Sequence, residues 1–126
     1  MKTPSLLAGL LICCAAAASA STQEEFPSGA ASPSAAELKE RLAGKSFDVQ
    51  LKNGISWRLQ YNTMGYFFVD ASTGGRTSGS WSAEDGKLCS QLKGNPSPQC
   101  SDVRVHQNQL VVRRTVNGEL ITLVPR

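Results

Sequence analysis

Apolar and polar residues alternate one by one through much of the chain after Gly44, and turn sequences interrupt the alternation. The first two alternating runs cover residues 47–51 and 55–61, with the pair Asn53-Gly54 between them. Alternation of this kind places apolar side chains on one face of a β-strand, and Asn-Gly between two such runs favours a tight hairpin turn. The region is therefore predicted to begin with a β-hairpin.

Further short apolar or alternating runs follow. They comprise residues 66–69, a strand around Trp81, residues 88–92, a strand through Val103 and Val105, and residues 110–112 and 120–124 around Asn117-Gly118. About seven or eight short strands joined by short turns are typical of an antiparallel up-and-down meander. Because an open sheet leaves two unpaired edges, we expect an all-β fold in which the meander curls into a small barrel.

The alternation also predicts which side chains face the barrel interior. The expected inward set is Phe47, Val49, Leu51, Ile55, Trp57, Leu59, Phe68, Trp81, Val103, Val105, Leu110 and Val112, with either Ile121 and Leu123 or Leu120 and Val124. Residues 66–69 are apolar on both faces, so part of their outer face is expected to be covered, and one candidate is a short helix predicted between Ser34 and Gly44. The inward set is large enough to fill a small barrel, which leaves a ligand cavity as an open alternative.

Residues 1–20 have the features of an export signal. Lys2 precedes an apolar run over residues 6–18, and Ala18-Ser19-Ala20 suits a signal peptidase. The run is shorter than the roughly 20 residues that a membrane-spanning helix needs, so we expect no membrane span. The sequence predicts a periplasmic or secreted protein.

The residues after the signal fall into an arm and a domain. Residues 21–33 are rich in Ser, Ala, Gly and Pro, which predicts a flexible arm. Ser34 and Glu37 have the spacing of a helix capping box, and Leu38 and Leu42 share one helix face. Residues 34–126 are predicted to form one domain, a short helix followed by the barrel.

Two of the four cysteines, Cys89 and Cys100, lie beyond the signal. An exported chain with one such pair normally oxidises it, so the sequence predicts a disulfide. In the chain-entropy model this closure stabilises the fold by roughly 3 kcal/mol. Two cysteines and a distant histidine do not supply the four ligands of a closed zinc site, and we predict no metal.

The charges indicate neither a nucleic-acid nor a membrane partner. The chain carries 13 Lys and Arg against 10 Asp and Glu, and the two signs are interspersed. The strongest basic cluster is Arg113-Arg114, but adjacent residues of a strand point to opposite faces and cannot act as one phosphate clamp.

We also expect the protein to be a monomer.

The residue types that catalysis requires are scattered. His106 is expected at a strand end, and residues 84–86, Glu-Asp-Gly, favour a turn. Asp48, Asp70 and Asp102 lie on separate predicted strands, and their convergence is the open alternative. The sequence predicts no enzyme and no cofactor.

The large aromatic residues suggest a site for an apolar ligand. Trp57, Tyr61, Tyr66 and Trp81 are the predicted ligand-binding residues, although rings of this size also serve as core. The loops over residues 62–65 and 72–79, with the disulfide loop, are expected to form a barrel mouth, a usual place for ligands.

Several short motifs resemble a known group of proteins. These are Leu-Ala-Gly at residues 42–44 leading into a strand, W-x-x-x-Y at 57–61, and G-x-W at 79–81 followed by DGKLC and a second cysteine before V-x-V. Over about residues 36–124 the chain resembles small exported bacterial lipocalin-like proteins of uncharacterised function. The resemblance implies a secreted or periplasmic antiparallel barrel with a disulfide and no assigned catalytic residues.

Residues 33–38, Pro-Ser-Ala-Ala-Glu-Leu, are similar to the start of the barrel in periplasmic inhibitors of secreted metalloproteases. Those proteins are also small barrels with one disulfide, and their flexible N-terminal arm enters the protease cleft. This chain differs because Gly44-Lys45-Ser46 lacks the tryptophan of their G-x-W strand and both cysteines lie late.

The function expected from the sequence is a non-catalytic exported binding module of the bacterial cell envelope. Its ligand would be a small apolar molecule or envelope component held at the barrel mouth. The alternative is an inhibitor of a secreted hydrolase that acts on this protein partner through the N-terminal arm or the loops.

Overall fold

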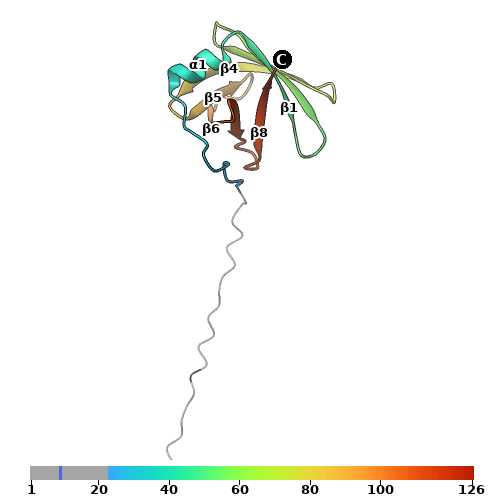
Figure 1. Ribbon diagram of the computed structural model, residues 1–126. Helices are drawn as coiled ribbons and strands as arrows, with labels where there is room; N and C mark the ends of the chain where they lie inside the picture. The colour runs from blue at the N-terminus through green and yellow to red at the C-terminus, as the bar shows by residue number, and fades with distance from the viewer. Residues whose placement is uncertain (1–8, 10–22) are drawn as a thin grey trace, which may run out of the picture.

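The computed structural model describes Gly9 and residues 23–126 (Figure 1). Within these residues the chain forms one short helix and a closed antiparallel barrel of eight strands, and Cys89 and Cys100 form a disulfide. The predicted all-β fold class is confirmed. The predicted export signal, residues 1–20, lies outside the described residues apart from Gly9.

The strands follow one another around the barrel in sequence order. They are β1 (Lys45–Gln50), β2 (Ser56–Tyr61), β3 (Tyr66–Ala71), β4 (Arg76–Glu84), β5 (Lys87–Leu92), β6 (Gln99–His106), β7 (Gln109–Arg113) and β8 (Leu120–Pro125). The barrel closes where β1 pairs with β8, with Asp48 opposite Val124. Closure gives each strand two hydrogen-bonded neighbours, which removes the open edges of a flat sheet.

The predicted hairpin turns are present. Gly54 has a φ of 89° in the turn between β1 and β2, and Gly118 has a φ of 73° between β7 and β8. These angles lie in the left-handed region that glycine adopts without a Cβ clash, which explains the Asn-Gly pairs.

The helix α1 (Ala35–Leu42) covers the end of the barrel at which β1 begins. The Ser34 hydroxyl accepts a hydrogen bond from the Glu37 N–H as the capping pattern predicts, and the Asp85 carboxylate accepts one from the Ala35 N–H at 2.8 Å. Leu38 and Leu42 are fully buried in the same apolar cluster as the barrel interior. Figure 1 shows α1 beside β4.

The prediction that Phe68 faces the interior is wrong. The pairing of β2 with β3 sets Tyr61 opposite Phe67 and Leu59 opposite Val69. Residues directly opposite one another share a face of the sheet, so Phe67 points inward and is buried, whereas Phe68 is 43% exposed. The alternation alone could not select the face because the run is apolar on both sides.

The outer face of β3 is also not covered as expected. Tyr66 is 53% exposed, because α1 packs against β4 and β1 rather than over β3.

The two alternatives for the inward residues of the last strand are resolved in favour of Ile121 and Leu123, which are buried, whereas Val124 is 45% exposed.

The segment expected to be a flexible arm has specific partners from Gln23 onward. Ala31 and Val105 exchange two backbone hydrogen bonds of 2.9 and 2.8 Å and form an isolated antiparallel bridge beside β6. The pairing of β5 with β6 ends at Asp102, so the far half of β6 has a free edge on that side. Backbone N–H and C=O groups on such an edge need partners, and the arm supplies them.

The arm is further fixed by a ring between two arginines. The guanidinium carbons of Arg104 and Arg113 lie 5.1 and 4.5 Å from the centre of the Phe26 ring. Arg113 also donates a hydrogen bond to the Glu24 carbonyl and forms an ion pair with Asp102. Composition alone did not indicate these contacts, because they depend on residues about eighty positions away.

We expect Phe26→Ala to lower the free energy of unfolding by about 1–2 kcal/mol, because two cation–π contacts and the packing of the ring are lost. Urea denaturation measures the change. Ser28→Ala, at an exposed position of the same segment, is the control and should leave the midpoint unchanged. Equal midpoints for the two variants would show that the contacts of the Phe26 ring contribute nothing measurable to stability.

Replacing both Cys89 and Cys100 by alanine should lower the free energy of unfolding by roughly 3 kcal/mol, since the unfolded chain regains the entropy of the open loop. The same urea experiment on the parent protein with a reductant should reproduce that loss. A double variant as stable as the oxidised parent would contradict the prediction.

Candidate ligand-binding cavity

A cavity of about 350 Å³ opens at the end of the barrel opposite α1. We call it the mouth cavity. Its buried lining side chains are Leu59, Tyr61, Phe67, Leu88, Val112 and Ile121, whereas its exposed lining residues include Asn95, Ser97, Gln99 and Thr115. The mouth cavity therefore has an apolar floor and a largely polar rim.

Gly79 allows the wall of the cavity to form. A Cβ at this position would lie 2.8 Å from Cε1 of Phe67 and 2.1 Å from the Gln91 carbonyl oxygen. Any side chain here would displace the Phe67 ring or separate β4 from β5, because carbon atoms do not approach so closely. Gly79 thus permits the inward position of Phe67 that the strand register imposes.

Tyr61 is the centre of an aromatic group at the inner end of the cavity. Its ring centre lies 6.2 Å from that of Phe47, 6.1 Å from that of Phe67 and 5.4 Å from that of Trp81. Edge-to-face and offset arrangements at these distances are favourable for aromatic rings. Burial raises the pKa of the Tyr61 hydroxyl, because the phenolate would lose its hydration.

The rim carries an arginine stacked on a tryptophan. The Arg114 guanidinium carbon lies 4.8 Å from the centre of the Trp57 ring, and both residues line the mouth cavity. Nη1 of Arg114 is 3.6 Å from a carboxylate oxygen of Glu119. The two adjacent arginines point to opposite faces as predicted, since Arg113 contacts Phe26 on the outer face.

The four predicted ligand-binding residues do not form one group. Trp57 and Tyr61 line the mouth cavity. Trp81 lies behind Tyr61 toward α1, and its Nε1 donates a hydrogen bond to the Asn62 carbonyl at 3.2 Å. Tyr66 lies on the outer face of β3.

Tyr66 belongs to a second hollow, an open groove of about 610 Å³ on the outside of β3, β4 and β5. Phe68 and Leu92 contribute its other large apolar side chains. Leu92 and Asn95 line both this groove and the mouth cavity, so the loop after β5 separates the two.

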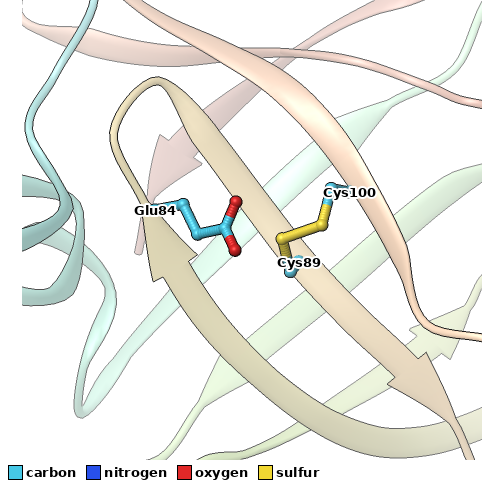
Figure 2. A group of neighbouring side chains, drawn as sticks. All are labelled: Glu84, Cys89 and Cys100. Carbon is cyan, nitrogen blue, oxygen red and sulfur yellow. A yellow bond between two sulfur atoms is a disulfide. The ribbon is translucent and has the colours of Figure 1, made fainter.

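The acidic and sulfur-containing residues offer little chemistry. Figure 2 shows the Glu84 carboxylate beside the Cys89–Cys100 disulfide, and ligand atoms of the three residues lie within 4.8 Å of one another. Because the sulfurs are bonded to each other, the oxidised protein provides only the carboxylate to a cation.

The three aspartates considered as an acidic site each have their own cation. Asp48 pairs with Arg126, Asp70 with Arg76 and Asp102 with Arg113, so the carboxylates are divided among three ion pairs. His106 is the last residue of β6 and lies opposite Gln109 in the pair with β7.

Comparisons with protein-family models, with curated proteins and with solved structures found no match to this chain. Among the described residues, no helix is long and apolar enough to span a membrane.

Sequence reasoning missed Arg114 as a cavity residue. The signal was present, because Arg114 follows Val112 by two positions and therefore continues the inward face of β7. A charged residue directly after a barrel strand, on the same side as the inward face of that strand, is the feature that marks it.

Replacement of Tyr61 should alter the dependence of stability on pH. The raised pKa means that the folded protein holds the phenolic proton more tightly than the unfolded chain does. This contribution is fully present below about pH 10, where a free tyrosine is still protonated, and is lost as the pH rises further. Urea denaturation of the parent between about pH 9 and pH 11 should show a steeper loss of stability than Tyr61→Phe.

Tyr66→Phe is the control for this experiment, because it removes the same hydroxyl from a side chain that is 53% exposed. We expect Tyr66→Phe to lose stability with rising pH as steeply as the parent does. If Tyr61→Phe also loses stability as steeply as the parent, burial does not control the ionisation of Tyr61.

Proposed function

We propose that the protein is a non-catalytic, exported binding module of the cell envelope that holds a small apolar ligand in the mouth cavity. The observation that carries the proposal is the apolar floor, built from Leu59, Tyr61, Phe67 and neighbouring buried side chains, beneath an open rim. A hollow of this kind with a few polar groups at its entrance is the usual form of a small-molecule site.

The size of the cavity supports a small ligand. Its volume of about 350 Å³ is near the lower limit of ordinary ligand sites, which begin at about 300 Å³. Each methylene group of a ligand that leaves water for the apolar floor contributes about 0.8 kcal/mol. A hydrocarbon part of several methylene groups would therefore contribute a few kcal/mol that offsets the cost of association.

The disulfide supports the proposed location. Cys89 and Cys100 lie directly opposite each other in the β5–β6 pair and are bonded. Disulfides of this kind persist in oxidising compartments, which agrees with a periplasmic or secreted protein.

The alternative proposal, inhibition of a secreted hydrolase, has less support through the arm. Residues that would enter a protease cleft are held on the barrel by the Ala31–Val105 hydrogen bonds and by the stacking of Phe26 on Arg104 and Arg113. An inhibitory arm would have to break these contacts. The exposed loop over residues 93–98 is the better candidate for a protein contact.

Ser101→Phe should abolish binding of the neutral fluorescent probe N-phenyl-1-naphthylamine to the mouth cavity. Ser101 lies opposite Leu88 and lines the cavity, so a phenyl ring at this position occupies the space of the ligand. Fluorescence titration of the purified mature protein measures the affinity, and we expect the parent to bind the probe with a stoichiometry of one.

Gln60→Phe is the matched control, because it places the same ring on the outer face of β2 at an exposed position. It should bind the probe as the parent does. Equal loss in both variants, or no saturable binding to the parent, would contradict the proposed function.

A further inference from the structure

Among the described residues that line the mouth cavity, Arg114 is the only one with a charged side chain. We propose that the ligand is an amphiphile whose carboxylate head pairs with Arg114 while its hydrocarbon part occupies the apolar floor. This inference rests on the proposed function and specifies the chemistry of the ligand.

The first support is the fixed position of the guanidinium. Arg114 continues the inward face of β7, and its guanidinium stacks on the Trp57 ring of β2 at 4.8 Å. Its side chain is only 20% exposed. A half-buried guanidinium that already lies over an aromatic ring has less freedom to lose when it binds a ligand than an exposed one has.

The second support is the free hydrogen-bonding capacity of this guanidinium. Its ion-pair partner Glu119 is 3.6 Å away, which is beyond hydrogen-bonding distance, and the structure gives the guanidinium no hydrogen bond to a described residue. The other carboxylate oxygen of Glu119 accepts a hydrogen bond from the Lys52 N–H at 3.3 Å. Glu119 therefore balances the charge of Arg114 without occupying its donors.

The neighbouring arginines make the contrast clear. Arg113 donates hydrogen bonds to the Glu24 carbonyl and to the Asp102 carboxylate. Arg104 donates to the carbonyls of Gly86 and Val103. Of these three half-buried arginines, Arg114 is the one whose donors are available to a molecule in the cavity.

The chemistry of the guanidinium selects the head group. Its planar N–H donors match the two oxygens of a carboxylate, and charge-assisted hydrogen bonds of this type are about twice as strong as neutral ones. The polar rim around Arg114 admits such a head, and the buried floor that includes Leu59 and Tyr61 receives the hydrocarbon part.

The test compares two ligands of equal chain length, decanoate and decanol, as competitors of N-phenyl-1-naphthylamine at about pH 8, where a carboxylic acid is ionised. We expect the parent to bind decanoate at least about tenfold more tightly than decanol. Arg114→Gln should bring the two affinities to within about twofold, mainly by weakening decanoate, and Arg114→Lys should retain part of the preference.

Arg58→Gln is the control for loss of one positive charge, because Arg58 is exposed and lies on the outer face of β2 between Asp48 and Asp70. It should keep the preference of the parent for decanoate. Thermal unfolding followed by circular dichroism establishes whether each variant is folded. If Arg114→Gln does not fold, the ratio of the decanoate and decanol affinities of the parent tests the carboxylate proposal.

The outcomes separate the head group from the cavity. If the parent binds decanol as tightly as decanoate while the probe still binds and Ser101→Phe still blocks it, the carboxylate proposal is overturned and the cavity stands. If the probe does not bind at all, the proposed function itself fails. A preference that survives Arg114→Gln, or one that Arg58→Gln abolishes as fully as Arg114→Gln does, would also overturn the assignment of Arg114.

Discussion

The pairing of β1 with β8 is the constraint on which the rest of the structure depends, because it turns a meander into a tube with two ends. The helix α1 is joined to β1 by only Ala43 and Gly44, so it has to lie at the end where β1 begins. Leu38 and Leu42 then fill that end. The opposite end has only loops to cover it, and the mouth cavity is the consequence.

Much of this architecture is predictable from the sequence, since single-residue alternation and Asn-Gly turns are local signals. The assignment failed at Phe68, where a run apolar on both faces leaves the register to long-range pairing with Tyr61 and its neighbours. The contacts of the arm were not predictable for a similar reason. They exist because β5 leaves the edge of β6 free near Val105, and no local pattern reports the length of a neighbouring strand.

The candidate site was predictable only in part. Trp57 and Tyr61 share the inward face of β2 because they are four residues apart in that strand, but Trp81 lies toward the helix end and Tyr66 lies on the outside. The disulfide also restrains the site, an effect that its predicted role in stability did not indicate. It ties β5 to β6 at the base of the loop over residues 93–98, so it restrains the part of the rim that separates the cavity from the outer groove.

The adjacent residues Arg113 and Arg114 have different roles in the structure. Arg113 is the last residue of β7 and Arg114 follows it directly; adjacent side chains of extended chain point to opposite faces, so Arg113 faces the arm and Arg114 faces the cavity. The outer arginine has acceptors in Glu24 and Asp102 and holds the arm on the barrel. The inner one is stacked on Trp57 with its hydrogen-bond donors unused by described residues. A half-buried cation in that condition gains most from an acceptor that enters with a ligand, because charge-assisted hydrogen bonds formed away from water are stronger than those that water provides.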